Sequence, residues 1–256
     1  MSRLENKIIL ITGASSGIGE ACARLFASQG ARLILTARRL DRLEILATEL
    51  KNTHGNEPYI HCLDVRNSAA VKTFLDSLPV AWQCIDVLLN NAGLALSSDP
   101  IQNGLIDNWE TMIDTNVKGL LYITRHVLPG MLQRQQGHIV NIGSIAGQEV
   151  YPNGNVYCAS KHAVRALTKS MRLDLMGSPI RVSEIAPGAV ETEFSLVRWQ
   201  DADKAKTFYQ DFTPLTAKDI ADAVYYCISA PPHVNIAELT ILPTDQASAN
   251  HIHRKK

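Results

Sequence analysis

Short runs of consecutive apolar residues alternate along this chain with longer segments in which apolar residues recur every three or four positions. Runs such as 7–11 and 31–37 are apolar on both faces, which is typical of strands buried between two helix layers. The spacing of Leu43, Leu46 and Leu50 is typical of one buried helix face. We predict strands at residues 7–11, 31–37, 59–65, 85–89, 138–142, 180–185 and 237–242. Helices are predicted at residues 20–28, 40–50, 67–77, 120–134, 156–176 and 216–229, and a further helix is predicted to start near Asp107 and to run through the region 112–117.

Polar residues mark the starts of several of these helices. A side chain that accepts a hydrogen bond from the first turn is typical of a helix N-terminus. Caps are expected at Asn67, at Asp107 with Glu110, and at Thr216 with Asp219. Inside the predicted helix 120–134 lies Pro129, so we also expect a bend or a break there.

The regular alternation of strands and helices indicates a parallel sheet with helices on both faces. No internal repeat, low-complexity tract or linker interrupts the alternation, so we predict a single domain over residues 1–256. The expected fold class is α/β, a doubly wound Rossmann fold with a seven-stranded parallel sheet between helix layers.

The composition excludes several classes of protein. With 46% hydrophobic and 20% charged residues, the chain is not intrinsically disordered. The 25 Lys and Arg residues balance the 25 Asp and Glu residues, so we expect no nucleic-acid partner. No apolar stretch approaches the roughly 20 residues needed to cross a bilayer, and no signal peptide is evident.

The cysteines and histidines give no sign of a metal site or of a disulfide framework. The five cysteines form no CxxC pair, which fits a reducing, cytoplasmic location. His251 and His253 lie in the polar tail 251–256, and a flexible or docked tail is favoured there over metal chelation.

A glycine-rich loop, 12–19, joins the first predicted strand to the first helix. Glycine permits a tight turn there and brings backbone N–H groups close to a pyrophosphate at the helix N-terminus. An ordinary strand-to-helix turn is the alternative, but the order of strand, loop, helix and strand favours a dinucleotide site. The expected contacts are Gly13, Ser15, Ser16, Gly17, Ile18 and Gly19.

The end of the second predicted strand indicates which dinucleotide binds. NAD sites usually have an acidic residue here for the ribose 2′-hydroxyl, whereas NADP sites offer a cation to the 2′-phosphate. This chain has Ala37 followed by Arg38 and Arg39, and a guanidinium binds phosphate in a bidentate manner. The alternative is that both arginines are solvated charges at a helix start. We predict that the cofactor is NADP.

Three further residues suggest acid–base chemistry. Tyr157 and Lys161 are four positions apart in a predicted helix and therefore lie on one face. A free tyrosine has a pKa of about 10, and a neighbouring ammonium favours the phenolate, so we expect Lys161 to lower the pKa of Tyr157. Ser144 follows the fifth strand, where ligands of open α/β sheets bind, and its hydroxyl can donate to a substrate oxygen.

Together these residues resemble the short-chain dehydrogenase/reductase family. The resemblance covers about residues 7–242 and includes the TGxxxGIG loop, the Asn-Asn-Ala-Gly stretch 90–93 and the Pro-Gly pair 187–188. It implies a catalytic tetrad with Tyr157 as acid and base, Lys161 on the nicotinamide ribose, Ser144 on the substrate oxygen and Asn116 on a water. The further cofactor contacts that it implies are Asp64, Val65, Asn90, Ala92, Gly93, Tyr157, Lys161, Pro187, Gly188, Val190 and Thr192.

Within this family the chain looks most similar to the NADP-dependent 3-hydroxy acid dehydrogenases, which act on serine, allo-threonine and related small acids. A carboxylate substrate needs a cation, and Arg198 lies in the segment of about 189–215 that closes over the substrate in the family. The expected substrate contacts are Ser144, Tyr157, Gln148, Tyr151 and Arg198.

Two other functions are compatible with the same residues. The first is an NADPH-dependent carbonyl reductase for an uncharged or thioester substrate. The second is a non-catalytic NADP(H) sensor, although such proteins typically lose the tyrosine or the lysine. The resemblance also implies a homotetramer.

Overall fold

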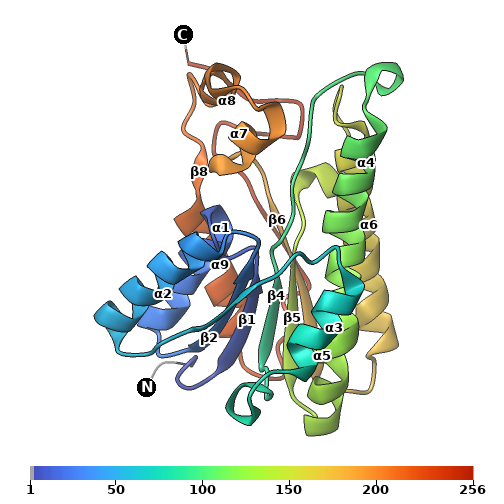
Figure 1. Ribbon diagram of the computed structural model, residues 1–256. Coiled ribbons are helices and arrows are strands. Elements are labelled where there is room, and N and C mark those ends of the chain that lie inside the picture. The colour runs from blue at the N-terminus through green and yellow to red at the C-terminus, as the bar shows by residue number, and fades with distance from the viewer. Residues whose placement is uncertain (1–2, 256) are drawn as a thin grey trace.

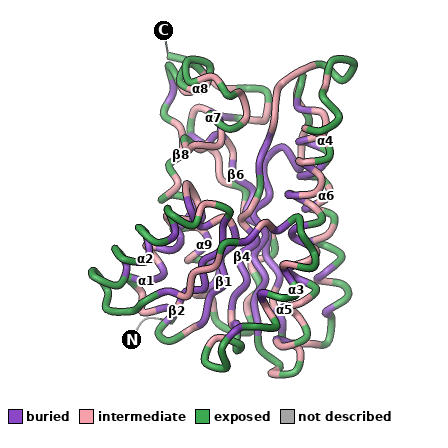
Figure 2. Tube along the Cα trace, in the orientation of Figure 1, coloured by how far each residue is buried: buried purple, intermediate pink, exposed green. Residues whose placement is uncertain are grey.

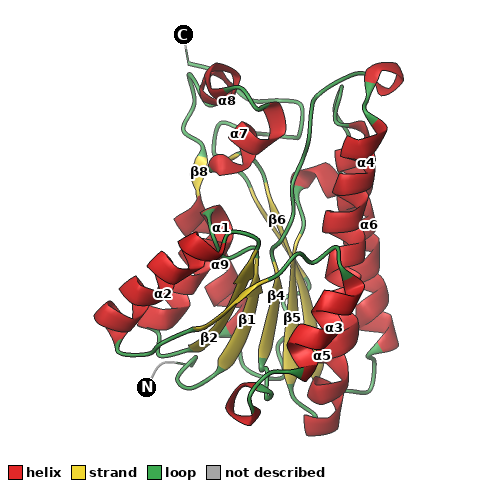
Figure 3. Cartoon of the chain, in the orientation of Figure 1, coloured by secondary structure: helices red, strands yellow, loops and turns green. Residues whose placement is uncertain are grey.

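Seven parallel strands form the central sheet of the computed structural model, which describes residues 3–255 (Figures 1 and 3). Their order is β3-β2-β1-β4-β5-β6-β9, so the chain starts in the middle of the sheet, builds one half and then crosses over to build the other. This is the doubly wound arrangement that the alternating pattern predicts. The strands are β1 (Ile8–Thr12), β2 (Arg32–Ala37), β3 (Tyr59–Cys62), β4 (Val87–Asn90), β5 (Gly137–Ile142), β6 (Ile180–Pro187) and β9 (Glu238–Ile241).

Helices cover both faces of the sheet (Figure 1). On one side α1, α2 and α9 pack against the sheet, and on the other side α3, α5 and α6 do so. The helices are α1 (Gly17–Ser28), α2 (Leu40–His54), α3 (Ser68–Asp76), α4 (Ile106–Ile113), α5 (Leu120–Arg134), α6 (Asn155–Asp174), α7 (Glu193–Trp199), α8 (Ala202–Phe208) and α9 (Ala217–Ile228). Short 3-10 helices occur at Val80–Trp82, Ile101–Asn103 and Ile145–Gly147.

The central strands are apolar because each of their faces meets a helix layer. In β1, Ile9 and Ile11 belong to the core beneath α1 and α9, whereas Ile8 and Leu10 belong to the core on the opposite face. Figure 2 shows the strands buried and the outer faces of the helices exposed. Burial on both faces explains why these strands show no alternation of polar and apolar residues.

The third strand is shorter than the predicted 59–65. It ends where β2 ends, because Ala37 and Cys62 are the last register pair between the two strands. The Leu63 amide still donates to the Ala37 carbonyl at 2.8 Å, but the chain then turns away from the sheet.

Two of the three predicted caps are present. The Asn67 side chain accepts a hydrogen bond from the Ala70 amide at 2.9 Å, and Thr216 with Asp219 forms a complete capping box at the start of α9. The predicted cap at Asp107 and Glu110 is wrong. Helix α4 begins earlier, at Ile106, so Asp107 already lies inside its first turn.

The helical region around Asn116 also differs from the prediction. A π-helical turn, Asp114–Gly119, joins α4 to α5 without a loop, so the two predicted helices form one continuous rod. Pro129 does not interrupt α5, which continues to Arg134. Pro129 and Arg125, the residue four positions before it, are both exposed, so solvent can reach the carbonyl that proline leaves without a partner.

The segment 189–215 forms a separate layer above the carboxyl ends of the strands (Figure 1). It contains α7, α8 and one half of a two-stranded parallel sheet, in which β7 (Val190–Glu191) pairs with β8 (Leu215–Thr216). The C-terminus lies beside α8, far from the N-terminus (Figure 1). Among residues 3–255, no helix combines the length and the apolar character that a membrane crossing requires.

Candidate active site

A cavity of about 710 Å³ lies at the carboxyl ends of the strands, between the sheet and the 189–215 layer. This is the edge at which open α/β sheets bind their ligands. Twenty of the predicted site residues line it: Gly13, Ser15, Ser16, Gly17, Ile18, Arg38, Arg39, Asp64, Val65, Ala92, Gly93, Ser144, Tyr151, Tyr157, Lys161, Pro187, Gly188, Val190, Thr192 and Arg198.

The glycine loop owes its shape to positive φ angles and close packing. Gly13 and Gly17 have φ values of 67° and 56°, a region that residues with a Cβ rarely adopt. A Cβ at Gly13 would also lie 2.9 Å from the Ala92 Cα, and one at Gly17 would lie 3.4 Å from the Thr192 side chain. The loop therefore lies directly against two other cavity-lining segments.

Gly19 has a packing role rather than the predicted contact with a cofactor, because it does not line the cavity. A Cβ there would lie 2.5 Å from the Gly13 carbonyl oxygen and from Asn91 Nδ2. The Asn91 amide donates to the carbonyls of Thr12 and Gly13 at 2.9 and 3.1 Å and so holds the loop. Sequence reasoning missed Asn91, although it is part of the Asn-Asn-Ala-Gly stretch.

Asn90 and Gln148 also lie outside the cavity. Asn90 is buried in the core, where its amide donates to Thr124 Oγ1 at 3.0 Å and to Asn141 Oδ1 at 2.9 Å. Gln148 donates to Thr240 Oγ1 at 2.7 Å instead of facing the substrate region. The structure therefore does not support the predicted ligand contacts of either residue.

The end of β2 forms a cationic corner of the cavity. Arg38 is exposed, and Arg39 donates to Ser16 Oγ at 2.7 Å and to Glu193 Oε2 at 2.9 Å. Arg42, outside the cavity, binds the other Glu193 oxygen at 2.5 Å. No acid follows β2 directly, so the donors suit a phosphate on the 2′ position better than a free ribose hydroxyl.

Asp64 and Val65 border the same corner. Arg66 binds the Asp64 carboxylate at 2.6 Å and, with Arg38 nearby, lowers the pKa of Asp64. The carboxylate therefore stays ionised at neutral pH. Asp64 is paired with Arg66, and Arg38 lines the same cavity.

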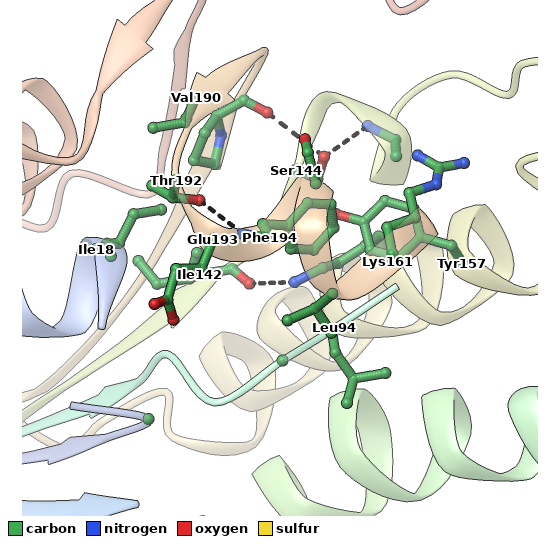
Figure 4. A pocket seen from close by; sticks show the side chains of 18 of the residues that line it. Ile18, Leu94, Ile142, Ser144, Tyr157, Lys161, Val190, Thr192, Glu193 and Phe194 are labelled. Carbon is green, nitrogen blue, oxygen red and sulfur yellow. Dashed lines mark hydrogen bonds between the residues drawn. The ribbon is translucent and has the colours of Figure 1, made fainter. Parts of the chain in front are cut away.

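Ser144, Tyr157 and Lys161 meet at the opposite end of the cavity (Figure 4). Ser144 lies two residues after the end of β5, and its Oγ accepts a hydrogen bond from the Ala146 amide at 3.1 Å. Tyr157 and Lys161 lie one helical turn apart on α6, as their spacing predicts. The Lys161 ammonium donates to the Ile142 carbonyl at 2.9 Å and lies 6.0 Å from the centre of the Tyr157 ring.

The electrostatics of this pair differ from the prediction. Burial raises the pKa of Tyr157, and the groups that oppose this effect are Ser144, through a hydrogen bond, and the Arg198 guanidinium. Lys161, whose ammonium binds the Ile142 carbonyl, is not among the main groups that shift the pKa of Tyr157. Burial in turn lowers the pKa of Lys161 to about 8.

Asn116 lies behind the cavity wall, on the π-helical turn. Its side chain accepts from the Leu94 amide at 2.9 Å and donates to the Leu94 carbonyl at 2.8 Å and to Ser160 Oγ at 2.9 Å. A Cβ on Gly93 would lie 3.3 Å from Asn116 Oδ1 and 3.6 Å from Lys161 Nζ. Asn116 is thus close to Lys161 on the other side of Gly93, but does not itself line the cavity.

Arg198, from α7, supplies a cation beside the tyrosine. It donates to the Tyr151 hydroxyl at 3.0 Å and to the Ser97 carbonyl at 3.2 Å. Its guanidinium carbon lies 5.8 Å from the centre of the Tyr157 ring. The fold thus brings together the phenol, the serine hydroxyl and a cation.

Several lining residues carry no sequence motif, and the prediction missed them. The C-terminal tail is docked: Arg254 donates to the Phe208 carbonyl at 3.0 Å, and Gln246 accepts from the Ala189 amide at 2.8 Å. Residues 3–255 contain no cluster of three metal-ligating side chains. The missed lining residues of the upper layer and the tail are Ala189, Glu193, Phe194, Ser195, Val197, Trp199, Phe208, Tyr209, Gln246, Ala249, Asn250, Ile252 and Arg254.

Known proteins of similar sequence align with this chain over almost their whole length. The family model described as short chain dehydrogenase matches residues 7–203. The NADP-dependent 3-hydroxy acid dehydrogenase YdfG of Escherichia coli K12 is 49% identical over 251 residues, which cover 97% of this chain and 100% of that protein. Sulfoacetaldehyde reductase 2 of Chromohalobacter salexigens is 47% identical over 242 residues, 94% of this chain and 95% of that protein.

A solved structure gives the same result at the level of the fold. The closed form of serine dehydrogenase complexed with NADP+ has a TM-score of 0.90 and 49% sequence identity, and the match covers 97% of this chain and 100% of that one. Since the family model spans most of the chain and the relatives align nearly from end to end, this chain belongs to the short-chain dehydrogenase family.

Proposed function

We propose that this chain is an NADP-dependent dehydrogenase that transfers a hydride between NADP(H) and the C3 alcohol or carbonyl of a small 3-hydroxy acid, such as serine, allo-threonine or 3-hydroxypropionate. The observation that carries the proposal is that one cavity is lined by Arg38 and Arg39, with no acidic residue directly after β2, and also by Tyr157, Ser144 and Arg198. The relatives named as NADP-dependent 3-hydroxy acid dehydrogenase and serine dehydrogenase support both the cofactor and the substrate class.

The residues of the cavity have distinct roles in this reaction. NADP, when bound, supplies the nicotinamide carbon that accepts or returns the hydride. Tyr157 takes the proton of the substrate hydroxyl during oxidation and gives it back during reduction. Ser144 donates a hydrogen bond to the substrate oxygen and, through its bond to Tyr157, favours the phenolate.

Lys161 and Asn116 support that proton transfer. The ammonium of Lys161, fixed by the Ile142 carbonyl, places positive charge on the tyrosine side of the cavity and offers donors to a ribose. Asn116 holds the backbone at Leu94 and thereby the Gly93 turn against which Lys161 rests.

Arg198 is the proposed partner of the substrate carboxylate. It is a half-buried cation near the phenol, and a guanidinium binds a carboxylate through two parallel hydrogen bonds. The substrate hydroxyl can then lie near Tyr157 while the carboxylate lies near Arg198.

A sulfonate in place of the carboxylate is the second candidate. The relative named sulfoacetaldehyde reductase favours it, because 2-hydroxyethanesulfonate has the same spacing between alcohol and anion as 3-hydroxypropionate. The same arginine serves either anion.

A comparison of kcat/KM values with NADP+ tests the proposal. The panel pairs 3-hydroxypropionate with uncharged 1,3-propanediol and adds serine, allo-threonine and 2-hydroxyethanesulfonate. We expect the acid to exceed the diol by about 100-fold, because only the acid uses the charged pair. Equal values would favour the carbonyl reductase for uncharged or thioester substrates. Tight binding of NADPH without turnover of any of these substrates would favour the non-catalytic NADP(H) sensor.

We further propose that the chain works as a cytoplasmic homotetramer, as the family resemblance implies. Light scattering coupled to size-exclusion chromatography measures the assembled mass directly. A mass near 28.1 kDa would identify a monomer and contradict the proposal.

A further inference from the structure

A buried carboxylate without a hydrogen-bond partner lies behind the active site. Glu184, on β6, is only 1% exposed, and neither of its side-chain oxygens has a partner among the described residues. Buried charges in proteins are normally paired, since an unpaired one is costly to desolvate. The position of Glu184 therefore calls for a specific role.

The fold places this carboxylate next to the backbone that separates two catalytic candidates. In the sheet register, Glu184 is the partner of Asn141 on β5. A Cβ on Gly143 would lie only 2.9 Å from Glu184 Cδ, so the carboxyl group rests on the bare backbone of Gly143. Gly143 follows Ile142, whose carbonyl binds the Lys161 ammonium, and precedes Ser144.

The other charges around Glu184 come from α6 and β9. Its register partner Glu238, on β9, binds the three outer cations of α6: Arg165 at 3.1 Å, Lys169 at 3.4 Å and Arg172 at 3.4 Å. The cation of α6 that Glu238 does not bind is Lys161, the buried one. Burial and Glu238 raise the pKa of Glu184 above its ordinary value, and Arg165, Lys161 and Arg172 oppose this shift and favour the carboxylate.

We propose that Glu184 is a positioning residue of the dehydrogenase reaction: its carboxylate, held against Gly143, is the buried negative charge that keeps Lys161 protonated. The effect of this charge on catalysis rests on the proposed function, because it requires that the Lys161 ammonium supports the reaction. The effect of Glu184 on the protonation of Lys161 does not depend on that function. Burial lowers the pKa of Lys161 to about 8, and the charge that opposes this effect is Glu184. Without Glu184, a larger share of Lys161 would be neutral at the pH of the cell.

The titration of Lys161 itself tests the inference without any need for turnover. The protein is labelled with 13C at the lysine Cε atoms, and the Lys161 signal is assigned by its loss in Lys161→Met. In Glu184→Gln we expect the pKa of Lys161 to fall by about 0.5 to 1 unit, a three- to tenfold weaker proton affinity. Glu184→Asp retains the charge but withdraws it, so its value should be intermediate.

Glu238→Gln is the matched control, because it removes the neighbouring carboxylate of the same sheet face. It should not lower the pKa of Lys161, since Glu238 binds the outer cations and opposes the ionisation of Glu184. If Glu184→Gln does not fold, as shown by circular dichroism, Glu184→Asp decides. A Lys161 titration equal to the parent in every folded Glu184 variant overturns the inference.

The pH profile of catalysis provides the second measurement. Oxidation requires the Tyr157 phenolate, which a neighbouring ammonium stabilises, so less charge on Lys161 should move the rising limb of kcat/KM to higher pH in Glu184→Gln. If the parent enzyme turns over none of the substrates, the proposed function is contradicted. The NMR titration still tests the effect of Glu184 on Lys161, because it needs no turnover. A lower pKa of Lys161 together with an unchanged pH profile of kcat/KM would support the effect of Glu184 on Lys161. It would contradict the proposed effect of the Lys161 ammonium on catalysis.

Discussion

At the scale of single residues, the active-site chemistry depends on polar groups that burial makes hard to ionise. Tyr157 and Lys161 are both buried, and burial moves their pKa values in opposite directions, each toward the neutral form. The surrounding groups that favour the charged forms are therefore as important as the pair itself. Ser144 and Arg198 act on Tyr157, and Glu184 acts on Lys161.

Tyr157→Phe removes the proposed proton carrier without changing the shape of the site. We expect kcat to fall by roughly 10²- to 10⁴-fold, because that is the contribution of a positioned acid or base. The dissociation constant of NADPH, measured by the change in its fluorescence, should stay within about twofold. Turnover close to the parent rate would remove Tyr157 from the reaction.

Arg198→Met tests the carboxylate partner. We expect KM for the hydroxy acid to rise by about 10- to 100-fold, since a charge-assisted pair is lost. KM for NADP should change little, and kcat/KM for the uncharged diol should fall less than that for the acid, since the diol loses only the effect of Arg198 on Tyr157. An unchanged KM for the acid would show that another group binds the carboxylate.

Arg38→Ala tests how NADP is recognised. We expect kcat/KM with NADP+ to fall by about 10- to 100-fold and that with NAD+ to stay nearly constant, because only NADP carries the 2′-phosphate. Arg42→Ala is the matched control, since Arg42 lies outside the cavity and should not alter the preference. Equal losses with both cofactors would point to a structural role.

At the scale of elements, the ends of helices show where local sequence determines structure. Asn67→Ala should lower the free energy of unfolding by about 1 kcal/mol, because it removes the acceptor for the Ala70 amide. Urea unfolding followed by circular dichroism measures this change. Asp107→Ala is the control: it caps nothing, so its effect should stay below about 0.5 kcal/mol, and a larger loss would restore the rejected capping box.

Features that depend on local sequence could be predicted from the sequence, and features that depend on contacts between distant elements could not. The seven strands are evident because each is a local apolar run, and the glycine loop is evident because its residues are contiguous. The π-helical turn and the short β3 are not, since they depend on contacts with other elements. Asn91 and the tail residues were missed for a similar reason: their positions at the cavity follow from long-range hydrogen bonds.

At the scale of the whole molecule, one carboxylate links the cofactor side to the layer above the sheet. Glu193, at the start of α7, binds Arg39 and Arg42 from the end of β2 and the start of α2. Both arginines lower the pKa of Glu193. The 189–215 layer is therefore tied to the end of β2, where Arg39 is a proposed contact of the 2′-phosphate.

The ion pairs of Glu193 with Arg39 and Arg42 depend on pH, because they lower the pKa of Glu193. Because the folded-state pKa of Glu193 lies below its unfolded value, the ion pairs stabilise the protein above about pH 4.3 and lose their effect as the pH falls through the folded-state pKa. The side chains are 36–42% exposed, so we expect Glu193→Gln to cost at most about 1 kcal/mol at pH 7 and less in high salt.

Thermal unfolding of the parent and Glu193→Gln between pH 3 and pH 8 checks this expectation. The two melting temperatures should differ at neutral pH and converge at the acidic end. A difference that persists unchanged down to pH 3 would mean that the carboxylate charge is not its source.

The docked tail has a practical consequence for anyone who produces this enzyme. Residues 252 and 254 line the cavity, and the Arg254 side chain is bonded to the end of α8, so extra residues fused after position 256 would emerge at the rim of the active site. The opposite terminus emerges at the far side of the molecule (Figure 1). Purification handles and immobilisation linkers therefore belong at the N-terminus.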